Sequence, residues 1–221
     1  WSESGPKVIS GFSRPFYHNL SGLMYGRRYD KKAYGGMIRH TEAGMLTQWA
    51  SQVPENGVIV EIGCYGGLST SYLLSGLKKK NGKIYAIDPF NSDLDKQAEL
   101  TDDCVPLEKK PTKELVASRL ENNGFGGMFE LIEGYSQEAA TAWDPSIKID
   151  FRWIDGNHEQ AYQDFKDFEP YLAPGARVAV HDAHPRYGYA AVVEDVKRIF
   201  NSRPWTDLEH VKSIISGKLA N

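Results

Sequence analysis

The sequence has few cysteines, no long apolar run and no excess of one charge. Only two of its 221 residues are cysteines, Cys64 and Cys104, too few for a disulfide-stabilised secreted fold, and we expect both to stay reduced in the cytoplasm. No apolar stretch approaches the roughly 18 residues that cross a bilayer, so we expect no membrane partner. The 26 Lys and Arg nearly balance the 29 Asp and Glu, which leaves no basic field to hold nucleic acid.

Short apolar runs rich in β-branched and aromatic residues predict buried strands at 58–62, 84–87, 129–132, 149–154 and 177–180. Stretches with helical spacing separate these runs, and such alternation predicts a parallel sheet with right-handed crossovers. Residues 205–211 and 213–219 predict two more strands, which must pair antiparallel because their connection is too short for a crossover helix. The prediction is therefore a Rossmann-like α/β fold with a seven-stranded, mostly parallel sheet, an antiparallel C-terminal strand and helices on both faces.

An apolar stripe ahead of the first strand predicts a further helix. Thr41 stands at its start, where threonine can cap a helix. We expect this helix to cover the sheet edge or a ligand cleft.

A glycine-rich turn, residues 63–67, joins the first strand to the following helix. Glycine lets the backbone approach a ligand closely, and free N–H groups at a helix start favour an anionic group. Asp88 ends the next strand, where an acidic side chain can accept hydrogen bonds from ribose hydroxyls. The turn lacks the G-x-G-x-x-G spacing typical of NAD enzymes. An adenosine-containing ligand is predicted, and a turn that only packs helix against strand is the alternative.

Three candidate metal ligands follow two strands that should be neighbours. Asp155 ends the fourth predicted strand, and His181 and Asp182 end the fifth. Aspartate oxygens suit Mg²⁺, and an imidazole widens the choice to Mn²⁺, Fe²⁺ or Zn²⁺. We expect one divalent ion, Mg²⁺ first, with Asp155 and Asp182 as the firmer ligands and His181 as third ligand or as support behind them.

Several motifs, taken in order, resemble the class I S-adenosylmethionine-dependent methyltransferases. They are the turn at 61–69, the strand end at Asp88, Gly134-Tyr135-Ser136-Gln137 and Ile154-Asp155. Their order is similar to that of catechol O-methyltransferase and of bacterial macrocin- and mycinamicin-type antibiotic or sugar O-methyltransferases. The resemblance covers residues 41–219 and implies a cofactor-binding methyltransferase domain over 41–221.

The resemblance also implies roles for individual residues. It places the methionine end of the cofactor at Gly63, Tyr65 and Ser69, the ribose at Asp88 and the adenine at Ser136 and Gln137, with Glu61 and Asp155 completing the set. The family holds a metal at the fifth strand end through acidic or amide ligands, so His181 is a departure. A catalytic lysine of the catechol enzymes corresponds in place to His158, and histidine accepts a proton readily near neutral pH. A helix cap is the alternative role for His158.

The implied function is transfer of the S-adenosylmethionine methyl group to a hydroxyl oxygen of a small molecule, such as a sugar, a polyketide or a phenolic natural product. A divalent metal would assist, and His158 would act as general base. Residues 1–40, which are rich in aromatic side chains, would form a lid or an oligomerisation segment that builds a homo-oligomer. A metal-independent methyltransferase and a non-catalytic adenosine-binding partner subunit of an oxygenase are the alternatives.

Overall fold

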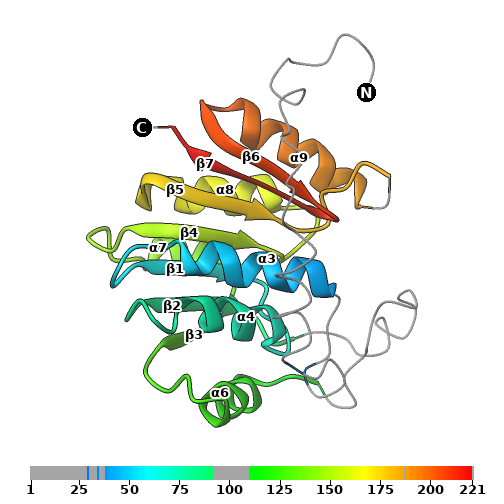
Figure 1. Cartoon of the computed structure of the whole chain (residues 1–221). Helices are drawn as coiled ribbons and strands as arrows, with labels where there is room; N and C mark the ends of the chain where they lie inside the picture. Colours follow the sequence, from blue (N-terminus) through cyan, green and yellow to red (C-terminus); the bar gives the residue numbers. More distant parts are fainter. Residues whose placement is uncertain (1–28, 30–33, 35–37, 92–109, 187, 221) are drawn as a thin grey trace.

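The computed structural model describes residues 29, 34, 38–91, 110–186 and 188–220. Its seven-stranded sheet has the order β3-β2-β1-β4-β5-β7-β6 (Figure 1). The strands are β1 Val58–Ile62, β2 Lys83–Asp88, β3 Phe129–Glu133, β4 Ile149–Ile154, β5 Leu172–Val180, β6 Trp205–Val211 and β7 Ile214–Leu219. Strands β1 to β5 pair in parallel, and β7 runs antiparallel to both β5 and β6. The predicted fold class is confirmed.

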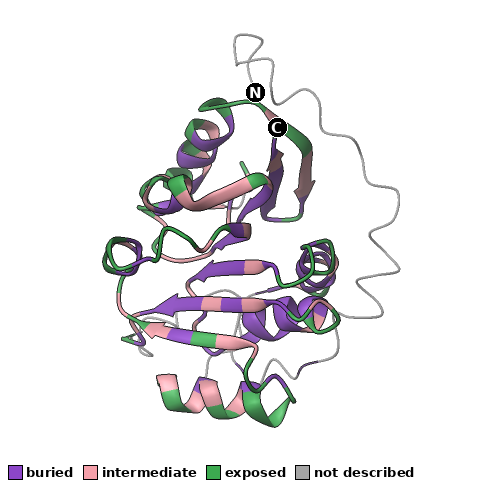
Figure 2. Cartoon of the chain, turned by 90° about the vertical axis from the view of Figure 1, so that its left-hand side faces the viewer, coloured by how far each residue is buried: buried purple, intermediate pink, exposed green. Residues whose placement is uncertain are grey.

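Helices cover both faces of the sheet. One face carries α3 (His40–Ser51), α4 (Leu68–Leu77) and α6 (Lys113–Asn122), and the other carries α7 (Ser136–Thr141), α8 (Ala161–Phe168) and α9 (Ala190–Asn201). A short 3-10 helix, η2 (Glu169–Tyr171), leads from α8 into β5. Figure 2 shows the buried positions concentrated on the strands and on the inward sides of the helices. No helix among the described residues is long and apolar enough to cross a membrane.

One predicted helix cap was wrong, and the position of α8 places His158 outside its helix. Helix α3 begins at His40 with Arg39 as its N-cap, so Thr41 lies inside the first turn and does not cap it. The Arg39 N–H is instead satisfied by the Glu42 side chain, at 2.8 Å. Helix α3 packs against α4 on a face of the sheet rather than along its edge. Helix α8 begins at Ala161, which leaves His158 in the turn before it.

The N-terminal segment predicted as a lid or oligomerisation element lies mostly outside the described residues. Two of its aromatic residues are described, and both are buried in the core, Tyr29 beside α4 and Tyr34 beside α6. Tyr29 packs edge-on against Tyr34 and Tyr72, with ring centroids 5.8 and 5.0 Å apart. These two tyrosines therefore contribute to packing.

The strand order brings the candidate site residues together at the carboxyl ends of the strands. Strands β2 and β3 follow on one side of β1, and β4 then pairs with β1 on its other side. Ligands of open α/β sheets bind where the order switches in this way, outside the carboxyl ends of the strands. The loops after β1, β2, β4 and β5 therefore meet at that point.

Strand β1 carries a buried carboxyl group just before this edge. Glu61 is 0% exposed and accepts a hydrogen bond from the Ser69 hydroxyl through Oε1, while its Oε2 has no hydrogen-bond partner among the described residues. Burial raises the pKa of Glu61 to about 8, against the lowering effect of the neighbouring Ser69 and Thr70 hydroxyls. The folded protein therefore keeps a proton on Glu61 over a pH range in which the unfolded chain has lost it.

This difference predicts a pH-dependent loss of stability. Between roughly pH 4.5 and 8 the folded state binds one more proton at Glu61, so the free energy of unfolding falls as pH rises, by up to about 1.4 kcal/mol per pH unit. Glu61→Gln, which is neutral throughout, should remove this contribution and become increasingly stable relative to wild type toward pH 8. Urea unfolding from pH 5 to 8 measures the free energy of unfolding of both proteins, and the exposed Glu121→Gln is the control. Parallel curves for wild type and Glu61→Gln would contradict it.

Candidate active site

A cavity of about 620 Å³ opens at the carboxyl ends of the strands. That volume lies within the roughly 300–1,000 Å³ typical of small-molecule sites. The turn after β1, the end of β2, the loop after β3, the segment after β4 and the end of β5 all contribute to its wall. Eight residues predicted for the site line it together: Gly63, Tyr65, Ser69, Asp88, Ser136, Asp155, His158 and His181.

Three other predicted residues are not among the described residues that line the cavity. Glu61 lies beneath the glycine turn, bonded to Ser69. The Gln137 amide Nε2 donates to the Gln160 side chain at 3.4 Å. Asp182 lies behind His158, with 3.1 Å between its Oδ2 and the His158 Nε2 atom.

The turn after β1 is fixed by close backbone contacts. Gly63 has φ 84°, and a Cβ atom there would lie 2.1 Å from the Asp155 carbonyl oxygen. Tyr65 also adopts a positive φ, 45°. Its N–H donates to Asp88 Oδ2 at 2.8 Å, and the Phe90 N–H donates to Oδ1 at 2.7 Å. Asp88 is thereby held in one orientation, and each carboxylate oxygen keeps a further lone pair for a ligand.

Asp164 of α8 is a cavity residue that the sequence reasoning missed. Its Oδ1 accepts a hydrogen bond of 2.5 Å from the Ser136 hydroxyl, and both residues are buried. The guanidinium of Arg152 donates to its backbone carbonyl from below. Burial raises the pKa of Asp164, despite the lowering effects of Ser136 and Arg152. The available signal was an acidic residue within the apolar stripe of α8, which contains Ala161, Phe165 and Phe168.

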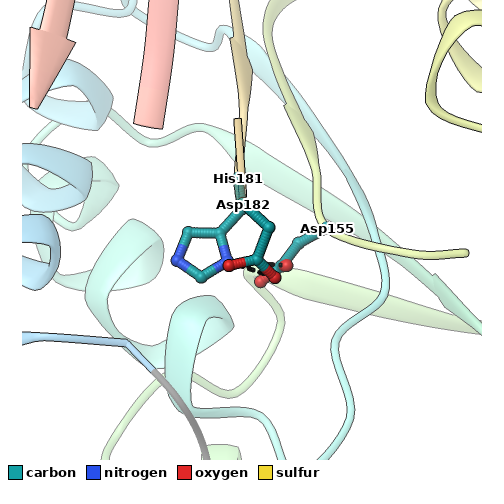
Figure 3. A group of neighbouring side chains, drawn as sticks. All are labelled: Asp155, His181 and Asp182. Carbon is teal, nitrogen blue, oxygen red and sulfur yellow. Dashed lines mark ion pairs between the residues drawn. The ribbon is translucent and has the colours of Figure 1, made fainter. Parts of the chain in front are cut away.

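The predicted metal ligands meet as expected (Figure 3). One ligand atom each from Asp155, His181 and Asp182 lies within 4.8 Å of the others. His181 Nδ1 is 3.0 Å from Asp155 Oδ1 and 3.4 Å from Asp182 Oδ2. Asp182 has φ 52°, a left-handed conformation that side chains other than glycine adopt at a cost and that often marks functional sites.

The electrostatics of the cluster follow from one imidazole lying among carboxylates. Burial alone would lower the pKa of His181, but Asp155, Asp182 and Glu42 raise it well above its ordinary value. Burial raises the pKa of Asp155, with the His181 ring opposing that effect. For Asp182 the close contacts with the His158 and His181 rings outweigh burial and hold its pKa far below the usual range.

Glu42 is a second residue that the sequence reasoning missed. Its carboxyl group is buried, and its Oε2 lies 3.6 Å from His181 Nε2. Burial would raise the pKa of Glu42, but His181, Ser213 and Arg39 together lower it to about 2. In the sequence Glu42 resembles an ordinary acidic residue of a first helical turn, so nothing marked it as part of a site.

His158 contacts the candidate metal ligands through Asp182. Its ring stacks on Tyr189 with centroids 3.7 Å apart and an interplanar angle of 12°. Its Nε2 faces Asp182 Oδ2, and the residue lines the cavity. Ring stacking and the carboxylate contact together fix the orientation of the imidazole.

Known structures share this fold at low sequence identity. The O-methyltransferase TomG from Streptomyces achromogenes, involved in tomaymycin synthesis and solved with S-adenosylmethionine, is 20% identical, with 83% of this chain and 82% of that chain covered and a TM-score of 0.61. An O-methyltransferase from Bacillus cereus, solved with S-adenosylhomocysteine, is 16% identical, with 82% of each chain covered and a TM-score of 0.59. The S-adenosylhomocysteine-bound Podospora anserina methyltransferase PaMTH1 is 13% identical over 97% of this chain and 92% of that chain, with a TM-score of 0.61. Such likeness supports the fold.

No curated protein sequence matches the chain at a significant level. A family model described as a methyltransferase domain matches residues 60–183. The match runs from β1 past the end of β5 and so includes the glycine turn, Asp88 and the metal-ligand candidates. The expectation of a methyltransferase is thereby confirmed, and the chain belongs to the methyltransferase domain family.

Proposed function

We propose that the protein transfers the methyl group of S-adenosylmethionine to a hydroxyl oxygen of a small molecule, with a divalent ion held by Asp155, His181 and Asp182. One observation carries the proposal. Two of the candidate metal ligands, Asp155 and His181, line the same cavity as Gly63 and Asp88, the residues expected to contact the cofactor. A methyl donor and an activated hydroxyl would therefore meet in one cavity.

The cavity wall suits S-adenosylmethionine. Gly63 leaves no side chain between the ligand and the β1 backbone, and Asp88 presents oriented carboxylate oxygens to ribose hydroxyls. The Ser136 and Asp164 pair adds polar atoms beyond β3, where we place the adenine. The bound cofactor supplies an electrophilic methyl group on a sulfonium. TomG was solved with this molecule, which supports the same assignment here.

The acid cluster suits a divalent cation. Among the described residues, neither nitrogen of the buried His181 ring makes a hydrogen bond of good geometry, although Nδ1 faces two carboxylate oxygens. An imidazole nitrogen and two carboxylates form an ordinary donor set for Mg²⁺ or Mn²⁺. When bound, such an ion supplies positive charge that lowers the pKa of a nearby hydroxyl.

His158 is placed to accept the hydroxyl proton. A carboxylate only accepts hydrogen bonds, so the contact with Asp182 puts the proton of the neutral His158 ring on Nε2. Nδ1 then keeps its lone pair and takes the proton as the acceptor oxygen attacks. The carbon–oxygen bond forms as the carbon–sulfur bond breaks, and the sulfonium leaves as a neutral thioether. Holding both reactants in line supplies much of the acceleration.

The acceptor is the next part of the proposal. We propose a sugar, polyketide or phenolic hydroxyl, because an ion beside the cavity favours an oxygen nucleophile over nitrogen or carbon. Residues 1–40 would cover the acceptor side or join two copies of the chain. A panel of such compounds, scored by release of S-adenosylhomocysteine, identifies the acceptor used in the turnover experiments below.

We predict that S-adenosylhomocysteine binds and NAD does not. Asp88→Ala should weaken S-adenosylhomocysteine binding by about 1–3 kcal/mol, because buried ribose hydroxyls and the N–H groups of Tyr65 and Phe90 lose their acceptor. Glu133→Ala, an exposed acid at the end of neighbouring β3, is the control and should leave affinity unchanged. Calorimetric titration measures both variants. Unchanged affinity in Asp88→Ala, or equal affinity for NAD, would contradict the cofactor assignment.

We predict that turnover requires a divalent metal. Chelation should abolish methyl transfer, and added Mg²⁺ should restore it, because the ion supplies the positive charge that stabilises the oxyanion. Asp182→Ala should not be rescued at the Mg²⁺ concentration that restores wild type. Full turnover after exhaustive chelation, with no metal found by elemental analysis, would favour a metal-independent enzyme in which His158 acts alone.

We predict that His158→Ala lowers turnover by about 10² to 10⁴, the usual contribution of a general base. Affinity for S-adenosylhomocysteine should stay nearly unchanged, since Asp88 and the glycine turn hold that ligand. His184→Ala, at a partly exposed histidine outside the cavity lining, is the matched control and should retain wild-type turnover. A His158→Ala enzyme with near-normal turnover would show that another group removes the proton.

A further inference from the structure

We propose that Glu42 positions the His181 ring, so that Nδ1 is the nitrogen offered to a metal. The inference rests on the proposed function, because it takes Asp155, His181 and Asp182 as the ligand set. Glu42 itself does not touch the cavity among the described residues. It would act through His181, from the opposite side of the imidazole.

The Glu42 carboxylate is held rigidly by two other parts of the fold. Its Oε1 accepts from the Ser213 N–H at 3.0 Å and from the Ser213 hydroxyl at 2.6 Å, in the turn between β6 and β7. Its Oε2 accepts from the Arg39 N–H at 2.8 Å. The side chain is 1% exposed. Helix α3 and the β6–β7 turn therefore fix where the second lone pair of Oε2 points.

The His181 ring lies between this carboxylate and the two aspartates. Nε2 is 3.6 Å from Glu42 Oε2, while Nδ1 on the far side faces Asp155 Oδ1 and Asp182 Oδ2. The His181 side chain is 4% exposed, and the indole of Trp153 flanks the ring at 5.5 Å between centroids. The ring is thus confined, with one nitrogen directed at each acidic group.

The chemistry of a carboxylate beside Nε2 selects one form of the ring. A carboxylate cannot donate, so its neighbour Nε2 keeps its proton and the lone pair of a metal-binding imidazole is left on Nδ1. In metal-bound histidines the ring nitrogen that does not bind the metal usually donates its N–H to such an acceptor. Loss of that acceptor weakens metal binding by about 10- to 100-fold. Glu42 lies within ion-pair distance of Nε2, where this acceptor would stand, on a helix that carries none of the other proposed ligands.

Glu42→Gln tests the proposal with almost no change in shape. The two Ser213 donors outnumber the single Arg39 N–H, so the amide oxygen takes the Oε1 position, and the new NH₂ faces both the Arg39 N–H and His181 Nε2. That donor favours a proton on Nδ1 and so opposes ligation. Calorimetric titration of the full chain with Mn²⁺ alone should show about 10- to 100-fold weaker binding than wild type. Affinity for S-adenosylhomocysteine should be unchanged.

Two comparisons separate positioning from a general structural role. Ser213→Ala removes one donor to Glu42 but leaves the carboxylate in place, so Mn²⁺ affinity should change by no more than about twofold. In a His181→Asn background the ligand has no tautomer to select, so adding Glu42→Gln should change Mn²⁺ affinity by no more than about twofold. If Glu42→Gln weakens Mn²⁺ binding equally in the wild-type and His181→Asn proteins, the proposal is overturned.

The remaining outcomes are also decisive. If Glu42→Gln does not fold, Glu42→Asp keeps the charge but withdraws it from Nε2, and it should still weaken Mn²⁺ binding. Wild-type affinity in a folded Glu42→Gln or Glu42→Asp protein overturns the inference while leaving the metal site intact. Failure of the wild-type protein to bind Mn²⁺ contradicts the proposed function itself.

Discussion

The candidate site depends on one backbone contact, between Gly63 at the end of β1 and Asp155 at the end of β4. Any side chain at Gly63 would run into the Asp155 carbonyl. The Asp155 N–H donates to the Ile62 carbonyl at 2.9 Å, and the Gly63 N–H donates to the Ile87 carbonyl at 2.9 Å. The turn proposed for the cofactor and the carboxylate proposed for the metal are therefore fixed relative to each other by adjacent strands, without any flexible connection.

Around that contact the charges are layered. Carboxylates and imidazoles follow one another across the site. The His181 ring lies between Glu42 on one side and Asp155 and Asp182 on the other, and Asp182 in turn contacts the His158 ring. Two neighbouring carboxylates repel unless a proton or a cation lies between them, and here the imidazole of His181 fills that role with its raised pKa. A metal would take the place of the Nδ1 proton, since ligands must be deprotonated to bind. Asp182 would then bind the ion and still accept a hydrogen bond from the His158 ring.

Much of this arrangement could be predicted from the sequence, because parallel strands place their carboxyl ends together. Asp155 and His181 follow strands that are neighbours, so their convergence follows from the strand pattern alone. Glu42 and Asp164 could not be found in that way. Glu42 reaches the site because α3 packs against α4 and β6, and because its side chain contacts Ser213, 171 positions further along the chain. The cap predicted at Thr41 failed for a related reason, since Glu42 satisfies the Arg39 N–H.

The central claim is that His181 and the two aspartates bind one divalent ion beside the cofactor cavity. Pulsed electron paramagnetic resonance on the protein loaded with Mn²⁺ and S-adenosylhomocysteine tests this claim most directly, because a directly bound imidazole nitrogen modulates the Mn²⁺ signal. We predict nitrogen modulation in the wild-type protein and its loss in His181→Asn. Bound Mn²⁺ without nitrogen modulation, or modulation that persists in His181→Asn, would contradict this account of the site.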